Sequence, residues 1–189
     1  YELLKSTQTK EFFYTDKNLE DIVIQRTKEL QKEKEHFKIL SSIDPLTGLY
    51  NRTKLEEMFK YEQKQSLRHN TNLSLILMDL DFFKSINDNH GHNTGDKFLK
   101  EIARELNYLF RDTDVIARWG GEEFIIACMH TNVDDAYLLA EKLRISIADA
   151  GNKHLKEVTA SFGVTMYMEG DSVDTLIQRA DKALYHSKD

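Results

Sequence analysis

The sequence has little of several features that would decide its class. It contains one cysteine, Cys128, which excludes a disulfide framework, fits a reducing compartment and lies in an apolar run typical of a protein core. No run reaches the roughly 20 apolar residues of a membrane span. Basic residues do not outnumber acidic ones, and the net charge of −6 argues against extended nucleic-acid binding through a basic face. We therefore expect a cytoplasmic domain with no membrane contact within this fragment.

The chain is expected to be part of a longer protein. It has no signal peptide, but Tyr1 is not a natural start. A hydrophobic content of 40% over 189 residues is enough for one well-buried domain with an appendage. Such a domain could belong to a soluble protein or be the cytoplasmic output part of a membrane-bound sensor.

Residues 1–43 are predicted to be a helical linker. From about residue 19 the segment is rich in Glu, Lys and Gln and lacks Gly and Pro. Apolar residues alternate at spacings of four and three, with Arg26 and Glu33 filling two seam positions: Leu19, Val23, Leu30, Phe37 and Leu40. This spacing favours a two-stranded coiled coil of marginal strength over a solvated amphipathic helix folded back on its own domain.

A second domain is predicted over residues 44–189. The only proline, Pro45, disfavours helical backbone at Asp44, and Gly48 permits a turn. Asn51 can cap the next helix. An ion pair between Asp44 and Arg52 would brace the entrance to the domain.

The pattern beyond this boundary alternates between strand and helix. Residues 73–80 form a nearly continuous apolar run, typical of a strand buried on both faces. Further segments with strand or helix periodicity are a helix from Phe98 to Leu109, a helix over 133–148, one or two strands over 158–168 bent at Gly163, and a last helix over 173–184. The predicted fold class is α/β (α+β), with helices flanking a central mixed, mainly antiparallel sheet.

A Gly-Gly pair marks a hairpin. Gly120 and Gly121 separate two apolar runs, and tight hairpin turns need positive φ at their central residues. Glu122 and Glu123 follow at once. Glycines let a phosphate approach the backbone and carboxylates bind hard cations, so this pattern indicates a site for a divalent cation and a phosphate.

Asp79 is the candidate partner of this hairpin. It closes the predicted strand over 73–80, and pairing of the hairpin beside that strand would bring Asp79 and Glu122 to one rim. Two close carboxylates repel unless a cation lies between them, and Mg²⁺ held by carboxylates and substrate phosphates resolves this. For Asp79 alone, a helix cap or a strand-end ion pair remains the alternative.

The residues after this strand suggest nucleotide contacts. Phe82, Phe83 and Lys84 could begin a helix whose free N–H groups point at an anion. An Asn amide with an Asp carboxylate, here Asn87 and Asp96, matches a guanine edge. Taken singly, a turn Asn and a helix-start Asp remain the simpler explanation.

These motifs together resemble the GGDEF diguanylate cyclases. The resemblance runs from about Asp44 to the last residue. It rests on seven motifs in order: Asp44-Pro45-Leu46-Thr47-Gly48-Leu49-Tyr50-Asn51-Arg52, Asp79-Leu80-Asp81-Phe82-Phe83-Lys84, Asn87-Asp88, Gly91-His92 with Gly95-Asp96, Arg118-Trp119-Gly120-Gly121-Glu122-Glu123-Phe124, Ser161-Phe162-Gly163-Val164 and Ala180-Asp181-Lys182-Ala183-Leu184-Tyr185.

The resemblance implies a fold similar to nucleotidyl cyclase and polymerase palm domains. It also implies condensation of two GTP molecules to cyclic di-GMP in a homodimer, with Mg²⁺ or Mn²⁺ as cofactor. The coiled coil would join the two subunits. Arg111 and Asp114 stand where the family carries an inhibitory site for its product, although a loop ion pair between them is the simpler alternative.

The family's functional residues carry over by position. Asp79, Glu122 and the Leu80 carbonyl match the metal ligands, and Glu123 matches the residue proposed to deprotonate the 3′-hydroxyl. Lys84 matches a catalytic position that also contacts phosphate. The substrate-binding positions are matched by Phe82, Phe83, Lys84, Asn87, His92, Asp96, Gly120, Gly121 and Lys188.

One feature departs from the family pattern. The chain ends one residue after Lys188, before the Gly-Arg that follows in the family, which would weaken nucleotide binding.

The rival function is an inactive module that senses GTP or cyclic di-GMP. Degenerate members lose the hairpin acids, whereas Glu122 and Glu123 are present here. An enzyme making a mixed adenine–guanine product would lack the Asp96 carboxylate.

Overall fold

The computed structural model describes residues 21–34, 42–154 and 158–187. The chain divides into two compact units, residues 1–41 and 42–189. In the first unit, residues 21–34 are helical, and Val23 and Leu30 are more than half exposed. Helical structure is therefore confirmed over this stretch. The coiled coil stays a prediction, because its other apolar positions (Leu19, Phe37 and Leu40) lie outside the described residues.

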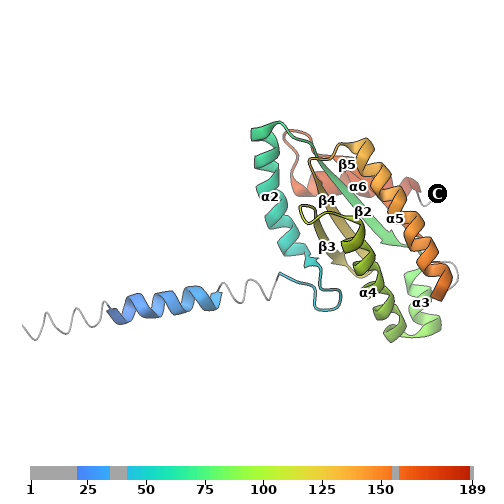
Figure 1. Cartoon of the computed structure of the whole chain (residues 1–189), viewed down its shortest axis with the longest axis horizontal. Coiled ribbons are helices and arrows are strands. Elements are labelled where there is room, and N and C mark those ends of the chain that lie inside the picture. Colours follow the sequence, from blue (N-terminus) through green and yellow to red (C-terminus); the bar gives the residue numbers. More distant parts are fainter. Residues whose placement is uncertain (1–20, 35–41, 155–157, 188–189) are drawn as a thin grey trace, which may run out of the picture. The chain divides into compact units, whose positions relative to one another are not determined.

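The second unit is built on a five-stranded sheet of order β1-β3-β4-β2-β5 (Figure 1). Only the β1–β3 pair is parallel, and the β3–β4, β4–β2 and β2–β5 pairs are antiparallel. The predicted mixed, mainly antiparallel sheet is confirmed. The strands are β1 (Tyr50–Asn51), β2 (Leu73–Leu80), β3 (Val115–Gly120), β4 (Glu123–Met129) and β5 (Ala160–Met166).

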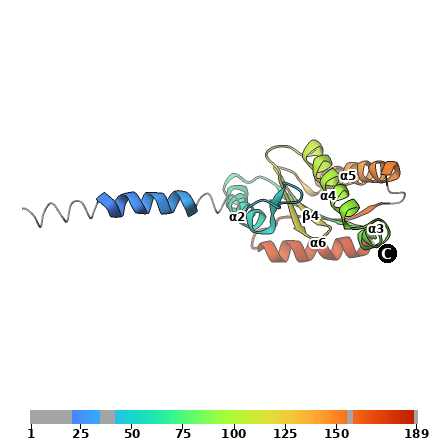
Figure 2. The same ribbon diagram turned by 90° about the horizontal axis from the view of Figure 1, so that it is seen from below.

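Helices cover both faces of this sheet (Figure 2). One buried cluster joins the sheet to α3, α4 and α5 through residues such as Phe98 and Leu143. The other joins it to α2 and α6 through residues such as Phe59 and Leu176. The helices are α2 (Arg52–His69), α3 (Phe83–His90), α4 (His92–Leu109), α5 (Val133–His154) and α6 (Val173–Ser187).

β2 is the strand on which both clusters depend. The predicted buried strand is confirmed over residues 73–80, and seven of its residues are buried. Its side chains alternate between the clusters: Leu75 and Leu77 belong to one, Ile76 and Met78 to the other. Since β2 pairs with β4 on one side and β5 on the other, its last residues lie at the rim where both neighbours meet it.

Two predicted elements differ from the structure. Residues 160–166 form one of the one or two predicted strands, and its register with β2 runs through Gly163 without interruption. Gly163 is required by close packing instead, because a Cβ there would overlap the Ala180 carbonyl of α6. Helix α5 continues to His154, past the predicted end. Asn51 caps α2 as predicted, its side chain accepting the Lys54 N–H at 3.0 Å.

The predicted Asp44–Arg52 ion pair is wrong. Asp44 pairs with Arg118 instead, at 3.2 Å, and the Nε of Arg52 donates to Glu56 at 3.0 Å. The cause is strand pairing: β1 places Asn51 in register with Arg118, so Arg52 begins α2 and directs its side chain along the helix. Only the strand order reveals which arginine reaches Asp44.

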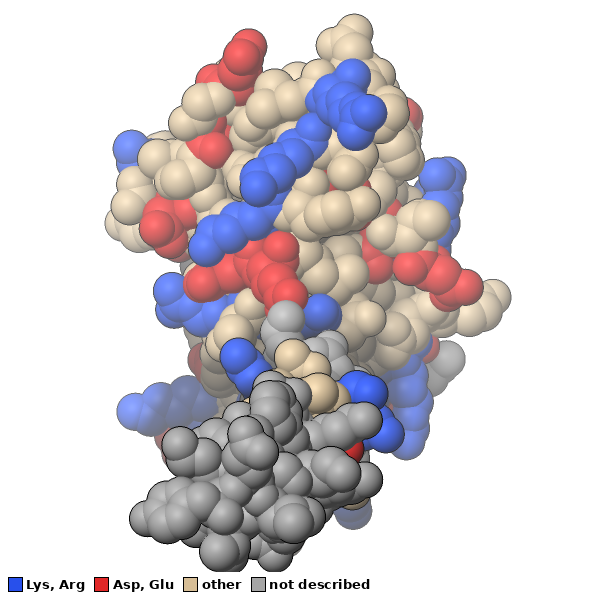
Figure 3. Space-filling view, turned by 90° about the vertical axis from the view of Figure 1, so that its left-hand side faces the viewer, with Lys and Arg blue, Asp and Glu red and all other residues tan. Residues whose placement is uncertain are grey.

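The surface near α2 carries both charge signs (Figure 3). Arg52 pairs with Glu56, and Lys54 lies 3.5 Å from Glu57.

Among the helices that the structure describes, none combines the length and apolar character needed to cross a membrane.

Candidate functional site

The two predicted acidic segments meet at one rim of the sheet. Asp79 lies opposite Glu123 in the β2–β4 register. The next N–H, that of Leu80, donates to the Glu122 carbonyl at 3.4 Å. On its other side, Asp79 lies opposite Ser161 of β5. The end of β2 is therefore held between the hairpin and β5.

The hairpin turn is displaced by one residue from the predicted position. Its turn residues are Gly121 and Glu122, while Gly120 still pairs with Glu123. Of the two glycines only Gly121 has positive φ, at 49°. The displacement arises from an irregularity between Arg118 and Gly120, where Trp119 has no register partner in β4. Glu122 therefore belongs to the turn and not to β4, so the alternation of side chains along a strand does not apply to it.

Arg118 holds this turn in place. Its Nη2 and Nε donate to the Gly121 carbonyl at 2.8 and 3.0 Å, and its Nη1 binds Asp44. Sequence reasoning gave Arg118 no role, because its two partners are brought together only by the fold. Its position directly before Trp119-Gly120-Gly121 was the one available signal.

The Asp44 carboxylate is ionised and accepts several hydrogen bonds. Its Oδ1 accepts the Thr47 N–H at 2.8 Å and the Thr47 hydroxyl at 2.6 Å. Burial raises the pKa of Asp44, but the Thr47 hydrogen bonds and the Arg118 charge outweigh it and bring the pKa below its usual value. Because Asp44 stays charged, the Arg118 guanidinium remains anchored beside the turn.

Asp81, two residues after Asp79, binds the start of β5. Its carboxylate accepts hydrogen bonds from the hydroxyls of Thr159 and Ser161 at 2.7 and 2.8 Å. Asp81 thus braces the start of β5.

A metal site at this rim would be a partial one, in which two carboxylates leave room for water and substrate phosphates. Among the described residues, no group of three or more His, Cys, Asp or Glu side chains could hold a metal ion. Mg²⁺ is usually bound by one or two carboxylates and completes its shell with water and substrate phosphates. The carboxylates of Asp79 and Glu122, with the Leu80 carbonyl, would supply such a partial set.

The start of α3 adjoins this rim. Phe82 has left-handed backbone with φ of 56°, is 80% exposed, and precedes the first helical residue, Phe83. The predicted helix start is confirmed. No side-chain hydrogen bond caps the start of α3, and Lys84 in its first turn is exposed. Uncapped N–H groups at a helix start favour an anion such as phosphate.

The structure packs Asn87 against the glycine that precedes Asp96. Gly95 precedes Asp96 on α4, and a Cβ at Gly95 would overlap Oδ1 of Asn87 on α3. Asp96 itself is exposed, as is His92 in the first turn of the same helix. Asn87 and the residue before Asp96 therefore meet where α3 packs on α4. Lys188 lies outside the described residues.

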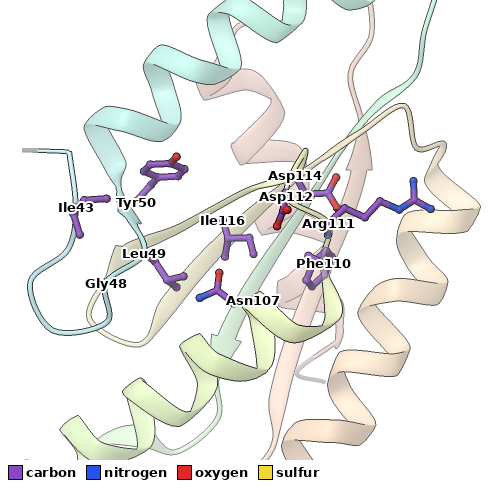
Figure 4. Close-up of a pocket in the computed structure, with 10 residues that line it drawn as sticks. All are labelled: Ile43, Gly48, Leu49, Tyr50, Asn107, Phe110, Arg111, Asp112, Asp114 and Ile116. Atoms are coloured by element: carbon purple, nitrogen blue, oxygen red, sulfur yellow. The ribbon is translucent and has the colours of Figure 1, made fainter. Parts of the chain in front are cut away.

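Arg111 and Asp114 border a cavity of about 310 Å³ (Figure 4). Asp114 accepts the main-chain N–H groups of Arg111 and Met129, each at 3.0 Å. Between the described side chains of Arg111 and Asp114 there is no ion pair, and in Figure 4 the Arg111 side chain extends away from Leu49 and Ile116. The loop shape thus depends on Asp114, while the guanidinium is exposed. The cavity is lined by Ile43, Gly48, Leu49, Tyr50, Asn107, Phe110, Arg111, Asp112, Asp114 and Ile116.

The chain is similar to a large group of signalling proteins. The family described as "Diguanylate cyclase, GGDEF domain" matches residues 41–189. Diguanylate cyclase DgcM of Escherichia coli is 39% identical over 177 residues, which are 93% of this chain and 42% of that protein. Response regulator PleD of Caulobacter vibrioides is 35% identical over 165 residues, covering 84% and 36%. The chain thus spans less than half the length of these relatives.

Solved structures show the same fold. The coiled coil and GGDEF domain of DgcB from Caulobacter crescentus, in complex with c-di-GMP, aligns with a TM-score of 0.75 and 27% identity, covering 90% of this chain and 94% of that one. The active GGEEF domain of a diguanylate cyclase from Vibrio cholerae aligns with a TM-score of 0.69 and 36% identity, covering 73% and 90%.

Proposed function

The chain belongs to the GGDEF diguanylate cyclase family, and from this membership we propose that it condenses two GTP molecules to cyclic di-GMP. Each 3′-oxygen would bond to the α-phosphorus of the other GTP, while the bond to pyrophosphate breaks. Two pyrophosphates and two protons leave. The observation that carries this proposal is the rim where Asp79 lies opposite Glu123 and Leu80 binds Glu122.

The product's two-fold symmetry requires two copies of the domain. One domain holds one nucleotide and cannot complete the reaction, so a C2 homodimer would bring two half-sites face to face. The helical segment before the domain would raise the local concentration of the second domain. A diguanylate cyclase fragment with a coiled coil and a GGDEF domain, that of DgcB, supports this arrangement by analogy.

The phosphates would be held by the α3 start and the hairpin. Main-chain N–H groups at Phe82 and Phe83 and the Lys84 ammonium would bind phosphate oxygens. Gly120 and Gly121 would allow close approach, since apart from the adjoining residues no described heavy atom lies within 4 Å of a Cβ built at either. Glu123 would accept the proton of the 3′-hydroxyl.

A divalent cation would complete the site. Asp79, Glu122 and the Leu80 carbonyl are the residues that would hold Mg²⁺ or Mn²⁺, which when bound neutralises charge on the transferred phosphoryl group. Base choice would rest with Asn87 and Asp96, because a carboxylate can accept from N1–H and the 2-amino group of guanine. Adenine offers no such donor pair.

Feedback by the product would involve Arg111. An exposed guanidinium can bind guanine O6 and N7 or a phosphate bidentately. Asp114 would mainly shape the loop, because both of its oxygens accept main-chain N–H groups.

The test is product identification with the full 189-residue chain. Wild type with GTP and Mg²⁺ should yield cyclic di-GMP, while ATP alone should yield no cyclic dinucleotide. Glu122→Ala should reduce the rate by on the order of a hundredfold or more, because it removes a charge that acts on the reacting phosphoryl group. The matched control is Glu169→Ala at an exposed loop position, which should keep the wild-type rate.

Two outcomes would reject the cyclase assignment. GTP binding without product at any protein concentration would favour a sensor module. A mixed adenine–guanine product would contradict the assigned role of Asp96. Turnover per subunit should rise with protein concentration, and a rate independent of concentration in a monomeric sample would contradict the dimer.

A further inference from the structure

Trp119 occupies an unusual place in the hairpin. The β3–β4 register pairs Arg118 with Phe124 and then Gly120 with Glu123, so Trp119 is skipped. A bulged residue is not fixed by the hydrogen-bond ladder, and bulges often re-aim the chain next to active sites. The orientation of Trp119 must therefore come from its side-chain contacts.

Arg52 provides one of these contacts. Its guanidinium carbon lies 4.1 Å from the centroid of the Trp119 ring, well within cation–π range. The Nε–H of the same guanidinium donates to Glu56 at 3.0 Å, which orients its plane. The guanidinium that stacks on Trp119 is thus also bound to Glu56 of α2.

The main chain of Arg52 is itself fixed to β3. Arg52 is the first residue of α2, and the capping residue before it, Asn51, lies in register with Arg118. The short segment over residues 42–52, here called the entrance segment, therefore contacts two consecutive residues of β3: Asp44 binds Arg118, and Arg52 stacks on Trp119.

We propose that Arg52 is a positioning residue for the catalytic hairpin, acting through the Trp119 ring. Gly120 and Gly121 follow Trp119 and have no side chains of their own to fix the turn. The stack before them would set where Glu122 projects toward Asp79. This role rests on the proposed cyclase function, since it concerns the metal-binding half of that site.

Loss of this contact should affect the metal-binding part of the site and leave the base-binding part unchanged. In Arg52→Ala, kcat should fall about two- to fivefold, the range that an exposed cation–π contact supplies. The Mg²⁺ concentration for half-maximal rate should rise by a similar factor. KM for GTP should stay within about twofold, because Asn87 and Asp96 lie on α3 and α4. Arg52→Lys should restore part of the loss, since a lysine keeps the charge but not the planar stack.

Trp119 reports the contact directly, because it is the only tryptophan in the chain. Arg52→Ala should increase acrylamide quenching of its fluorescence, whereas Arg68→Ala, which removes the same charge from an exposed position on α2, should not. In a Trp119→Leu background the effect of Arg52→Ala on kcat should vanish, as a double-mutant cycle would show. Circular dichroism and thermal unfolding of each variant identify any that fail to fold.

The outcomes are distinguishable. Wild type without product would remove the cyclase function and the positioning role with it. If wild type turns over, an Arg52→Ala variant with more quenching but unchanged kcat and Mg²⁺ dependence would show a purely structural contact. If Arg52→Ala does not fold, Arg52→Lys decides by the same readouts: wild-type kcat and Mg²⁺ dependence together with increased quenching would overturn the role.

Discussion

Asp44 and Arg118 form an ion pair in which both side chains are only 17% exposed. One residue lies in the segment that enters the domain, and the other holds the carbonyl of Gly121 in the hairpin turn. Arg118 therefore connects the entrance segment to the turn that carries Glu122.

The first prediction concerns this pair. Asp44→Asn should lower the free energy of unfolding by about 1.5–3 kcal/mol at pH 7, the usual contribution of a hydrogen bond to a charged group. It should also reduce turnover, because Arg118 loses its anchor. Urea unfolding and the rate of cyclic di-GMP formation are the measurements. Asp174→Asn at an exposed position of α6 is the control, and equal stability of the two variants would contradict the prediction.

The same pair predicts a pH dependence. The pKa of Asp44 in the folded protein lies below its usual value of 3.8. The stabilisation is therefore present above that value and is lost as the pH falls through the lower, folded-state pKa. The stability difference between wild type and Asp44→Asn should shrink below about pH 4. A difference that stayed constant down to pH 2 would mean that Asp44 is not the titrating group.

Gly95→Ala should separate substrate binding from stability. Alanine favours a helix interior over glycine by up to about 1 kcal/mol. Here, however, its Cβ would overlap the Asn87 amide and crowd the Phe83 ring. We expect KM for GTP to rise roughly tenfold, while the melting temperature changes by a few degrees at most. Asn93→Ala, at an exposed position of the same helix, should leave KM unchanged.

Gly163→Ala should act on stability. The added Cβ would meet the main-chain carbonyl of Ala180, which cannot move without shifting α6. A loss of about 2–3 kcal/mol is expected for such overpacking, and it corresponds to a melting temperature lower by roughly 4–12 °C. Gly120→Ala, where a Cβ meets nothing within 4 Å, should keep stability and lose activity. Unchanged stability in Gly163→Ala together with lost stability and full activity in Gly120→Ala would refute the packing role of Gly163 and the phosphate-binding role of Gly120.

Arg111 and Asp114 should behave differently when replaced. Arg111→Ala should weaken inhibition by cyclic di-GMP by roughly 1–3 kcal/mol, or about five- to 150-fold in inhibitor concentration, with stability unchanged. Asp114→Ala should destabilise the fold, because the N–H groups of Arg111 and Met129 lose their acceptor. Inhibition curves and thermal unfolding measure the two effects. Equal effects of both variants on stability would contradict this division.

The periodic elements could be predicted from the sequence, because each depends on its own residues. The apolar run at 73–80, the Asn51 cap and the helix start at Phe83 are local signals, and all three are confirmed. The mixed sheet followed from the alternation of strands and helices around one hairpin.

What the sequence did not predict depends on pairing between distant segments. The bulge at Trp119 moved the hairpin turn by one residue, and no local pattern marks it. Likewise, the sequence suggested Arg52 as the partner of Asp44, and only the β1–β3 register reveals that Arg118 takes this place. Gly163 suggested a bend, but its true constraint is a helix that follows later in the chain. Roles of the site residues beyond their placement stay predictions.

The close approach of Gly95 to Asn87 has a consequence for how such a domain can diversify. The two helices that would read the base are locked to each other, whereas the hairpin is secured through β3 and the entrance segment. Substitutions on the helix pair could exchange one nucleobase for another without slowing the chemistry. Changes in the entrance segment could instead alter the placement of the hairpin without altering which nucleotide is accepted.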